Sequence, residues 1–356
     1  MAVLVGTFIS RLFEKRSHKF FMFFTFFYML ILVGFRYEVG KDWDNYFRIY
    51  KYCGETAIRS YSASFIEPLY YLLNKIVYFT TNGNFIALNV VVAFFSLLFF
   101  WKSFSRLTKN YSLTIYIFIS FCMIYHMMNQ QRQMLSLAIA LYGIVYLIYG
   151  NDKKFLSYVI VGSLIHYSSI IILILYFLKD VDIKKNVKKY FGAAIIPLVM
   201  YDTLYAFLLK TKYARFIVSG YNIRMQTSVV INTAVRATML IIILLSYKRL
   251  LTNAYSVSEK RRICIGYNMA IISVIIQIWT LRSAMFGRLS TFFFLGFALM
   301  IPEIIENMKI WTNRMVGRFM TIVFMTVYHF VYYTNSAANI GVDTYDNIIS
   351  HVFHIG

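Results

Sequence analysis

Residues 85–101 read FIALNVVVAFFSLLFFW, an apolar run that contains no charged side chain. A membrane-spanning helix needs about 20 such residues, because a helix rises about 1.5 Å per residue across a hydrocarbon core of about 30 Å. The chain repeats this pattern many times between polar or charged clusters. The other apolar segments are 20–35, 65–80, 111–128, 133–149, 155–178, 190–209, 228–247, 263–280, 288–302 and 316–334. This pattern predicts an all-α polytopic membrane protein.

The composition of the 356-residue chain supports the same class. The chain is 60% hydrophobic and only 14% charged, whereas soluble globular domains are about 25% charged. Three prolines and three cysteines exclude a collagen-like chain and a disulfide-rich secreted module. We therefore expect one integral membrane domain over residues 1–356, with no separate soluble domain.

The net charge of +21 is interpreted as membrane topology rather than nucleic-acid binding, because Lys and Arg accumulate in cytoplasmic loops. If every apolar segment crossed once, the basic stretches 102–110 and 150–154 would face outward. Both lie inside if segments 65–80 and 155–178 enter the membrane and return, or lie at its surface. We therefore expect about nine to eleven transmembrane helices, one or two of them broken or re-entrant. A single crossing helix stays the alternative for 155–178, since 24 residues would span about 36 Å.

The same topology places the N-terminus in the cytoplasm and three connections on the outside. They are 36–64, which is the first periplasmic loop, 210–227 and 280–290.

Arginines gather toward this outer side of the predicted membrane. An arginine inside a membrane is costly and usually faces a cavity or a partner, and its planar guanidinium binds phosphate oxygens in a bidentate manner. We interpret the group as a site for a pyrophosphate or a phospholipid headgroup, with snorkelling and ion pairing to Asp202 or Glu67 as the alternative. The substrate-binding candidates are Arg36, Arg132 with its neighbour Gln133, Arg215, Arg224, Arg236, Arg282 and Arg288.

The first outer loop contains two carboxylates, Asp42 and Asp44, followed by Tyr46. One carboxylate could act as general base toward a sugar hydroxyl, while the tyrosine could stack on a sugar ring. An Asp-x-Asp pair can also hold a divalent metal, but no third ligand lies nearby in the sequence, and we expect no metal. The alternative is a turn that caps a loop helix.

His166 is the one histidine deep inside an apolar segment, in the stretch LIHYSS. A neutral imidazole can accept a proton and orient a hydroxyl, although a single buried histidine is more often part of the core. The motifs Gly-x-Ser-x-Gly, His-Glu-x-x-His and the phosphate-binding loop do not occur in the sequence. Serine hydrolase, zinc protease and P-loop chemistry are therefore disfavoured.

Five short motifs follow one another along most of the chain. They are Arg36 with Gly40-x-Asp42 and Tyr46, then Glu67-Pro68-Leu69-Tyr70, then Arg132-Gln133, then Ile165-His166-Tyr167-Ser168, and finally Arg288-Leu-Ser-Thr-Phe-Phe leading to Ile301-Pro302. In this order they resemble the EpsG/Wzy family of bacterial polysaccharide polymerases.

The resemblance implies a GT-C-like membrane glycosyltransferase of O-antigen, lipopolysaccharide or exopolysaccharide biosynthesis. Such an enzyme joins undecaprenyl-pyrophosphate-linked oligosaccharide repeat units at the periplasmic face of the cell inner membrane. The lipid-linked oligosaccharide is then both donor and acceptor, membrane lipids surround the protein, and a chain-length regulator is a candidate partner. No cofactor and no nucleic acid are implied.

The residues and the resemblance together predict a mechanism. Asp42 or His166 deprotonates the acceptor hydroxyl, which attacks the anomeric carbon with inversion. Arg132 and Arg288, helped by Arg36, stabilise the departing lipid pyrophosphate.

Three other functions stay open from the sequence. A flippase for the same lipid-linked glycan would need polar residues at both depths of the membrane. An O-antigen ligase would differ only in its acceptor. A membrane acyltransferase should have an acidic partner close to His166, and no acidic residue lies within ten positions of it in the sequence.

Overall fold

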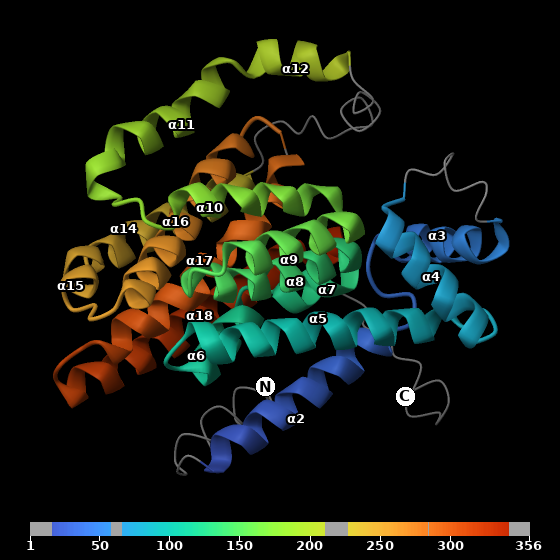
Figure 1. The fold of residues 1–356 in the computed structure, drawn as a ribbon, viewed down its shortest axis with the longest axis horizontal. Helices are drawn as coiled ribbons and strands as arrows, with labels where there is room; N and C mark the ends of the chain where they lie inside the picture. Colours follow the sequence, from blue (N-terminus) through green and yellow to red (C-terminus); the bar gives the residue numbers. More distant parts are fainter. Residues whose placement is uncertain (1–15, 58–65, 211–226, 284, 342–356) are drawn as a thin grey trace. The chain divides into compact units, whose positions relative to one another are not determined.

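The structure is a computed structural model that describes residues 16–57, 66–210, 227–283 and 285–341. Within these residues the regular elements are helices, and no β-sheet is present (Figure 1). The predicted all-α polytopic class is therefore confirmed.

Five helices of the described residues are long and apolar enough to cross a membrane. They are α5 (Phe85–Leu107), α8 (Gln131–Ile148), α16 (Val257–Trp279), α17 (Met285–Glu306) and α18 (Trp311–Ile340). The number rises to seven if two bent pairs each form one span, α6 (Tyr111–Ser120) with α7 (Met123–Asn129), and α11 (Val187–Val199) with α12 (Tyr201–Leu209).

Three shorter apolar helical stretches accompany these spans. They are the apolar part of α2 (Arg16–Gly34), the stretch Tyr167–Leu178, and most of α14 (Thr227–Leu244). The count of nine to eleven crossing helices stays a prediction.

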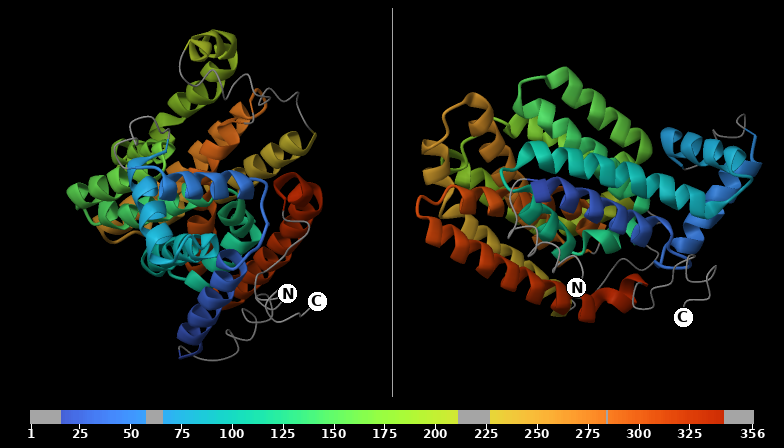
Figure 2. Two further views of the ribbon diagram at one scale, coloured as in Figure 1. Left: turned by 90° about the vertical axis from the view of Figure 1, so that its right-hand side faces the viewer. Right: turned by 90° about the horizontal axis from the view of Figure 1, so that it is seen from below.

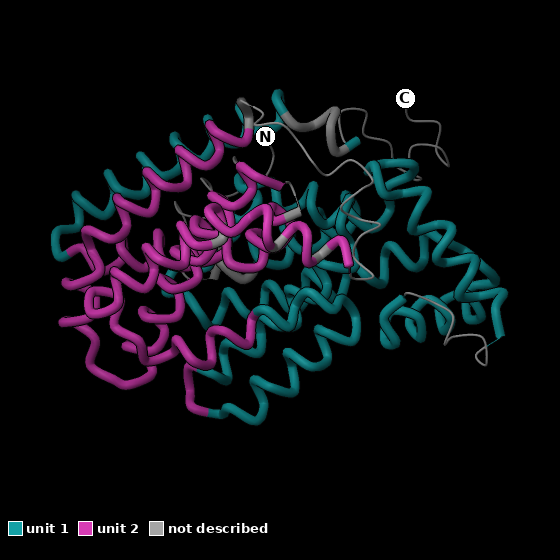
Figure 3. The backbone as a smooth tube through the Cα atoms, turned by 90° about the horizontal axis from the view of Figure 1, so that it is seen from above, with its two compact units in different colours: residues 1–147, 151–171, 309–356 teal, residues 148–150, 172–308 magenta. Residues whose placement is uncertain are grey.

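The chain forms two compact units (Figure 3). The first unit contains residues 1–147, 151–171 and 309–356, and the second contains 148–150 and 172–308. Besides the helices already given, the first unit includes α3 (Trp43–Glu55), α4 (Pro68–Thr80) and α9 (Asp152–Ile165). The second includes α10 (Ile174–Leu178), the short 3-10 helix Lys184–Asn186 and α15 (Tyr247–Thr252). The prediction of a single membrane domain stays a prediction.

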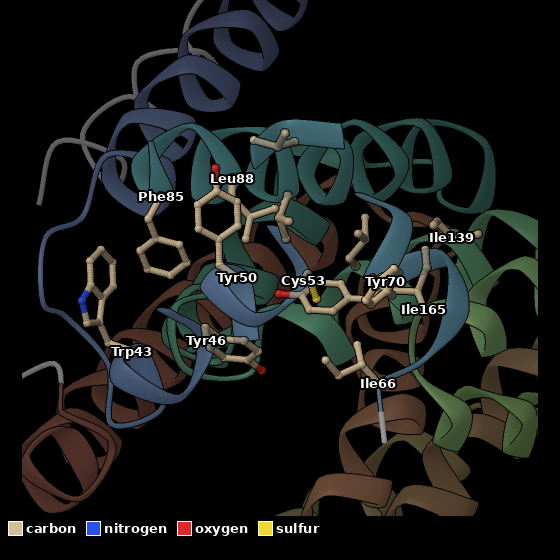
Figure 4. Close-up of a cluster of buried hydrophobic side chains, with 14 residues drawn as sticks. Trp43, Tyr46, Tyr50, Cys53, Ile66, Tyr70, Phe85, Leu88, Ile139 and Ile165 are labelled. Atoms are coloured by element: carbon tan, nitrogen blue, oxygen red, sulfur yellow. The ribbon is translucent and has the colours of Figure 1, made fainter. Parts of the chain in front are cut away.

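In the first unit α2 packs along α5, and α18 packs along α6 (Figure 2). Beside them, α3 buries one face whose residues recur every three or four positions, the spacing of an amphipathic helix. This face carries Trp43, Tyr46, Tyr50 and Cys53, which pack against α4 and the start of α5 (Figure 4). The packed aromatic face fixes α3 and α4 against each other, which positions the residue just before α4.

The helix α4 begins with Pro68 at its first position, where the missing N–H of proline has no intrahelical partner to lose. Glu67 is its N-cap residue in extended conformation. With 13 residues, α4 is about 20 Å long, which is too short to cross a bilayer. This length agrees with the expectation that segment 65–80 does not cross.

The segment 155–178 is broken at His166. The helix α9 ends at Ile165, His166 is extended with φ −153° and ψ 111°, and a 3-10 helix then runs over Tyr167–Leu173. The hydroxyl oxygens of Ser163 and Ser169 lie 3.3 Å apart, whereas six residues of a continuous helix would separate them by about 9 Å along the axis. The chain therefore turns back at His166, and the single-helix alternative is wrong.

In the second unit α16 and α17 pack backbone against backbone. A Cβ atom on Gly296 would lie 2.5 Å from the backbone nitrogen of Ala270 and 2.7 Å from the carbonyl oxygen of Gly266. Only glycine permits this approach. The same helix pair carries an ion pair of 3.0 Å between Arg262 and the buried carboxylate of Glu303.

Candidate functional site

The polar centre of the first unit is the carboxylate of Glu67, of which only 4% is exposed. Its Oε2 accepts a hydrogen bond from Nη1 of Arg132 at 2.7 Å. Its Oε1 lies 3.0 Å from Nδ1 of His166 and 3.3 Å from the backbone nitrogen of Tyr167. One carboxylate thus joins the start of α4, the start of α8 and the reversal after α9.

Glu67 is held in its ionised form. Burial by itself raises the pKa of the carboxyl, but the hydrogen bond from His166 and the charge of Arg132 outweigh it, and the pKa lies below its usual value. A carboxylate can only accept hydrogen bonds. Nδ1 of His166 must therefore carry a proton, and in the neutral form of the ring the lone pair lies at Nε2.

That Nε2 atom makes no hydrogen bond within the described residues. The side chain of His166 is 24% exposed, so the ring is reachable from outside the packed interior. A histidine fixed through Nδ1 by a carboxylate, with its other nitrogen open, is the arrangement of a general base.

Arg132 is held from several sides at the first turn of α8. Besides Glu67, it hydrogen bonds with the side chain of Tyr46, and its guanidinium carbon lies 5.5 Å from the centre of the Tyr70 ring. Its Nε is buried and has no hydrogen-bond partner in the described part of the chain. The side chain is 21% exposed, so this fixed cation combines an unused N–H donor with an accessible edge.

Arg36 lies in the interior with 1% exposure. Its Nη1 donates to the carbonyl oxygen of Val33 at 2.6 Å, and its Nη2 donates to Oε1 of Gln131 at 2.7 Å. Nε2 of Gln131 in turn donates to the hydroxyl of Tyr70 at 3.0 Å. Arg36 thus supports the ring on which Arg132 lies, and its direct binding to substrate stays a prediction.

The two aspartates of the first outer loop lie at the start of α3. Asp42 is the N-cap residue, half-buried, and its side chain makes no capping hydrogen bond. Its backbone N–H donates to Oδ1 of Asn129 at 3.0 Å. Asp44 is exposed in the first turn, while Tyr46 is buried with its ring 6.5 Å from that of Tyr70. Of these three, only Tyr46 contacts the Glu67 group through a described bond.

Gln133, the neighbour of Arg132 on α8, is buried. The remaining predicted arginines lie elsewhere. Arg236 of the second unit is buried, and it donates from Nη1 to Ser290 at 2.8 Å and from Nε to Asn232 at 3.2 Å. Arg282 and Arg288 are exposed in the same unit. Arg215 and Arg224 lie outside the described residues, so a shared chamber for all arginines stays a prediction.

Glu67 is the residue that sequence reasoning missed as a member of the site. It entered only as an ion-pair partner and as part of the motif Glu67-Pro68-Leu69-Tyr70. No acidic residue lies within ten positions of His166 in the sequence, yet Glu67, 99 positions away, lies 3.0 Å from it in space. The usable signal was an acidic residue directly before Pro68 at the start of an apolar segment.

Within the described residues no group of three or more His, Cys, Asp or Glu side chains could hold a metal ion. The expectation that the protein uses no metal stays a prediction.

The fold and the site together define a multi-pass, all-α membrane protein with a buried carboxylate–imidazole–guanidinium group. The family model described as the EpsG family matches residues 19–350, nearly the whole chain, and the chain belongs to this family. The predicted resemblance is thereby confirmed, and membership supports a polysaccharide polymerase-like role. No curated protein and no solved structure matches the chain.

Proposed function

We propose that this protein polymerises oligosaccharide repeat units linked to undecaprenyl pyrophosphate, at the periplasmic face of the bacterial inner membrane. The growing glycan on its lipid is the donor, and a single lipid-linked repeat unit is the acceptor. The observation that carries the proposal is the carboxylate of Glu67, which bridges His166 and Arg132.

In this proposal His166 is the general base. Its Nε2 takes the proton from the acceptor hydroxyl, whose oxygen forms a bond to the anomeric carbon with inversion. The bond between that carbon and the pyrophosphate oxygen breaks, and the lipid pyrophosphate leaves with the electron pair. Glu67 keeps the imidazole in the required tautomer and stabilises the imidazolium that forms.

Arg132 stabilises the pyrophosphate as it departs. Its guanidinium is already held by Glu67 and lies against the ring of Tyr70, so little reorganisation is needed when negative charge develops. The accessible edge of the side chain supports this role over a purely structural ion pair. The choice of His166 over Asp42 rests on the same contacts.

The acyltransferase alternative also uses a histidine with an acidic partner, and the pair formed by His166 and Glu67 satisfies that requirement. Family membership favours glycan polymerisation instead. A gel of surface glycan distinguishes the polymerase from the flippase and ligase alternatives.

The test is a gel of surface glycan from a deletion strain that carries His166→Ala or Arg132→Ala. We expect glycan with a single repeat unit and no ladder, at normal protein level. Unchanged ladders in both strains would refute the proposed site, and complete loss of surface glycan would indicate a flippase or a ligase. Purified protein with excess chelator should keep its activity, and loss of product there would indicate a metal.

A further inference from the structure

Three tyrosines gather at the opposite end of α8 from Arg132. Tyr142 and Tyr146 lie on α8, and Tyr158 lies on α9, with ring centres 5.3 to 5.6 Å apart. The rings of Tyr146 and Tyr158 are stacked at an interplanar angle of 9°. The three tyrosines therefore form one row of rings in contact.

This gathering depends on a close approach of two helices. A Cβ atom on Gly143 of α8 would lie 2.8 Å from Cβ of Tyr158. A larger residue at this position would push α9 away and separate the ring of Tyr158 from the other two. Gly143 therefore permits the close packing of α8 and α9 that brings the three tyrosines together.

Two cations, Arg106 and Lys154, lie against the rings of this row. The guanidinium carbon of Arg106, in the last turn of α5, lies 6.0 Å from the ring centre of Tyr142. Nζ of Lys154, in the first turn of α9, lies 5.0 Å from the ring centre of Tyr146. Within the described residues neither cation forms an ion pair. Two positive charges thus lie at this end outside any direct ion pair of the described residues.

The row also offers hydrogen-bond donors. Each of the three tyrosines carries one hydroxyl O–H group that can donate to an acceptor. Hydroxyl donors beside an ammonium and a guanidinium group match the oxygens of a phosphate. Fourteen residues separate Tyr146 from Arg132, about 21 Å along α8, so this place is distinct from the Glu67 site.

We propose that Arg106, Tyr142, Tyr146, Lys154 and Tyr158 bind the phosphate of an anionic membrane lipid headgroup. Exposed apolar side chains continue from this place along the same helices, Phe95 on α5 and Leu156 and Ile160 on α9. These side chains offer an apolar surface for acyl chains next to the cations. A soluble phosphate would not need such a surface. Tyrosine at a membrane–water boundary is a common anchor of this kind.

The test uses full-length protein in nanodiscs of equal parts phosphatidylglycerol and phosphatidylcholine, with native mass spectrometry of the lipids that stay bound. The double variant Arg106→Gln/Lys154→Gln should retain phosphatidylglycerol about tenfold less well than the wild type. Tyr146→Phe keeps the ring and should reduce the preference in the same direction. Lys51→Gln is the matched control, because Lys51 is also exposed over an aromatic ring, that of Phe47, at 4.6 Å.

The proposal is overturned if the double variant and Tyr146→Phe both keep the wild-type preference while melting at the wild-type temperature. It is also overturned if Lys51→Gln lowers the preference equally, since any lost charge would then suffice. Binding of inorganic phosphate in discs of phosphatidylcholine alone, with no displacement by phosphatidylglycerol, would indicate a soluble anion instead of a lipid.

Discussion

Replacing Glu67 by Gln is the most informative change, because it removes one charge and keeps the shape of the side chain. The carboxylate accepts from Arg132 at 2.7 Å, from His166 at 3.0 Å and from the Tyr167 backbone at 3.3 Å. An amide has only one acceptor oxygen. Its NH₂ group must therefore face either Arg132 or His166, and each of these donates a hydrogen bond to the carboxylate in the wild type.

The size of the effect follows from that mismatch. If the amide oxygen stays on Arg132, the NH₂ group faces Nδ1 of His166, which can accept only if the proton moves to Nε2. The lone pair needed for base catalysis is then lost, and we expect polymerisation to slow by about 10²- to 10⁴-fold. If the amide turns around, a charge-assisted bond to Arg132 is lost, which costs about 1.5–3 kcal/mol, or roughly 10- to 150-fold.

The assay is chain growth by purified protein on a lipid-linked repeat unit, with melting temperature measured on the same preparation. Glu55→Gln is the matched control, since Glu55 is an exposed carboxylate at the end of α3. A Glu67→Gln protein that polymerises within twofold of the wild type would refute the proposed role of the carboxylate. Equal losses in both variants would point to a general effect of charge.

The remaining predictions concern Arg132, acid pH and helix packing. Arg132→Lys keeps the charge but loses the planar fork, so the rate of chain growth should fall by about tenfold or more, and a wild-type rate would contradict this. The pKa of Glu67 is lowered in the folded protein, so the ionised carboxylate stabilises the fold at pH values above the usual pKa of a glutamate. This stabilisation is lost as the pH falls through the lowered pKa. The wild type should therefore melt at a higher temperature than Glu67→Gln at neutral pH, and this difference should disappear only below about pH 4. Gly296→Ala forces a Cβ atom against backbone and should cost about 1–3 kcal/mol in thermal unfolding, whereas Gly192→Ala, whose Cβ meets its nearest atom at 3.8 Å, should melt normally.

The membrane class follows from the sequence because apolar length between charged clusters is a local property. The break at His166 was also predictable, since an uninterrupted 155–178 helix conflicted with the charge distribution of its flanking loops. The pairing of Glu67 with His166 was not, because it depends on how α4 packs beside α9. Sequence distance gave no guide to that contact.

The arginines show the same limit. The cost of a buried guanidinium marks Arg36, Arg132 and Arg236 as special, but it does not say which of them faces a substrate. Packing makes Arg36 a support for Gln131 and leaves Arg132 with an accessible edge. Arg236 is held by Ser290 and Asn232 in the second unit.

The most direct measurement follows lipid pyrophosphate release and glycan length together, in nanodiscs that contain wild-type protein, His166→Gln or Asp42→Asn. We expect that wild type and Asp42→Asn release one lipid pyrophosphate for each repeat unit added, while His166→Gln neither releases lipid pyrophosphate nor extends the glycan. Chain growth by His166→Gln at the wild-type rate, or its loss in Asp42→Asn alone, would contradict a reaction centred on Glu67 and His166.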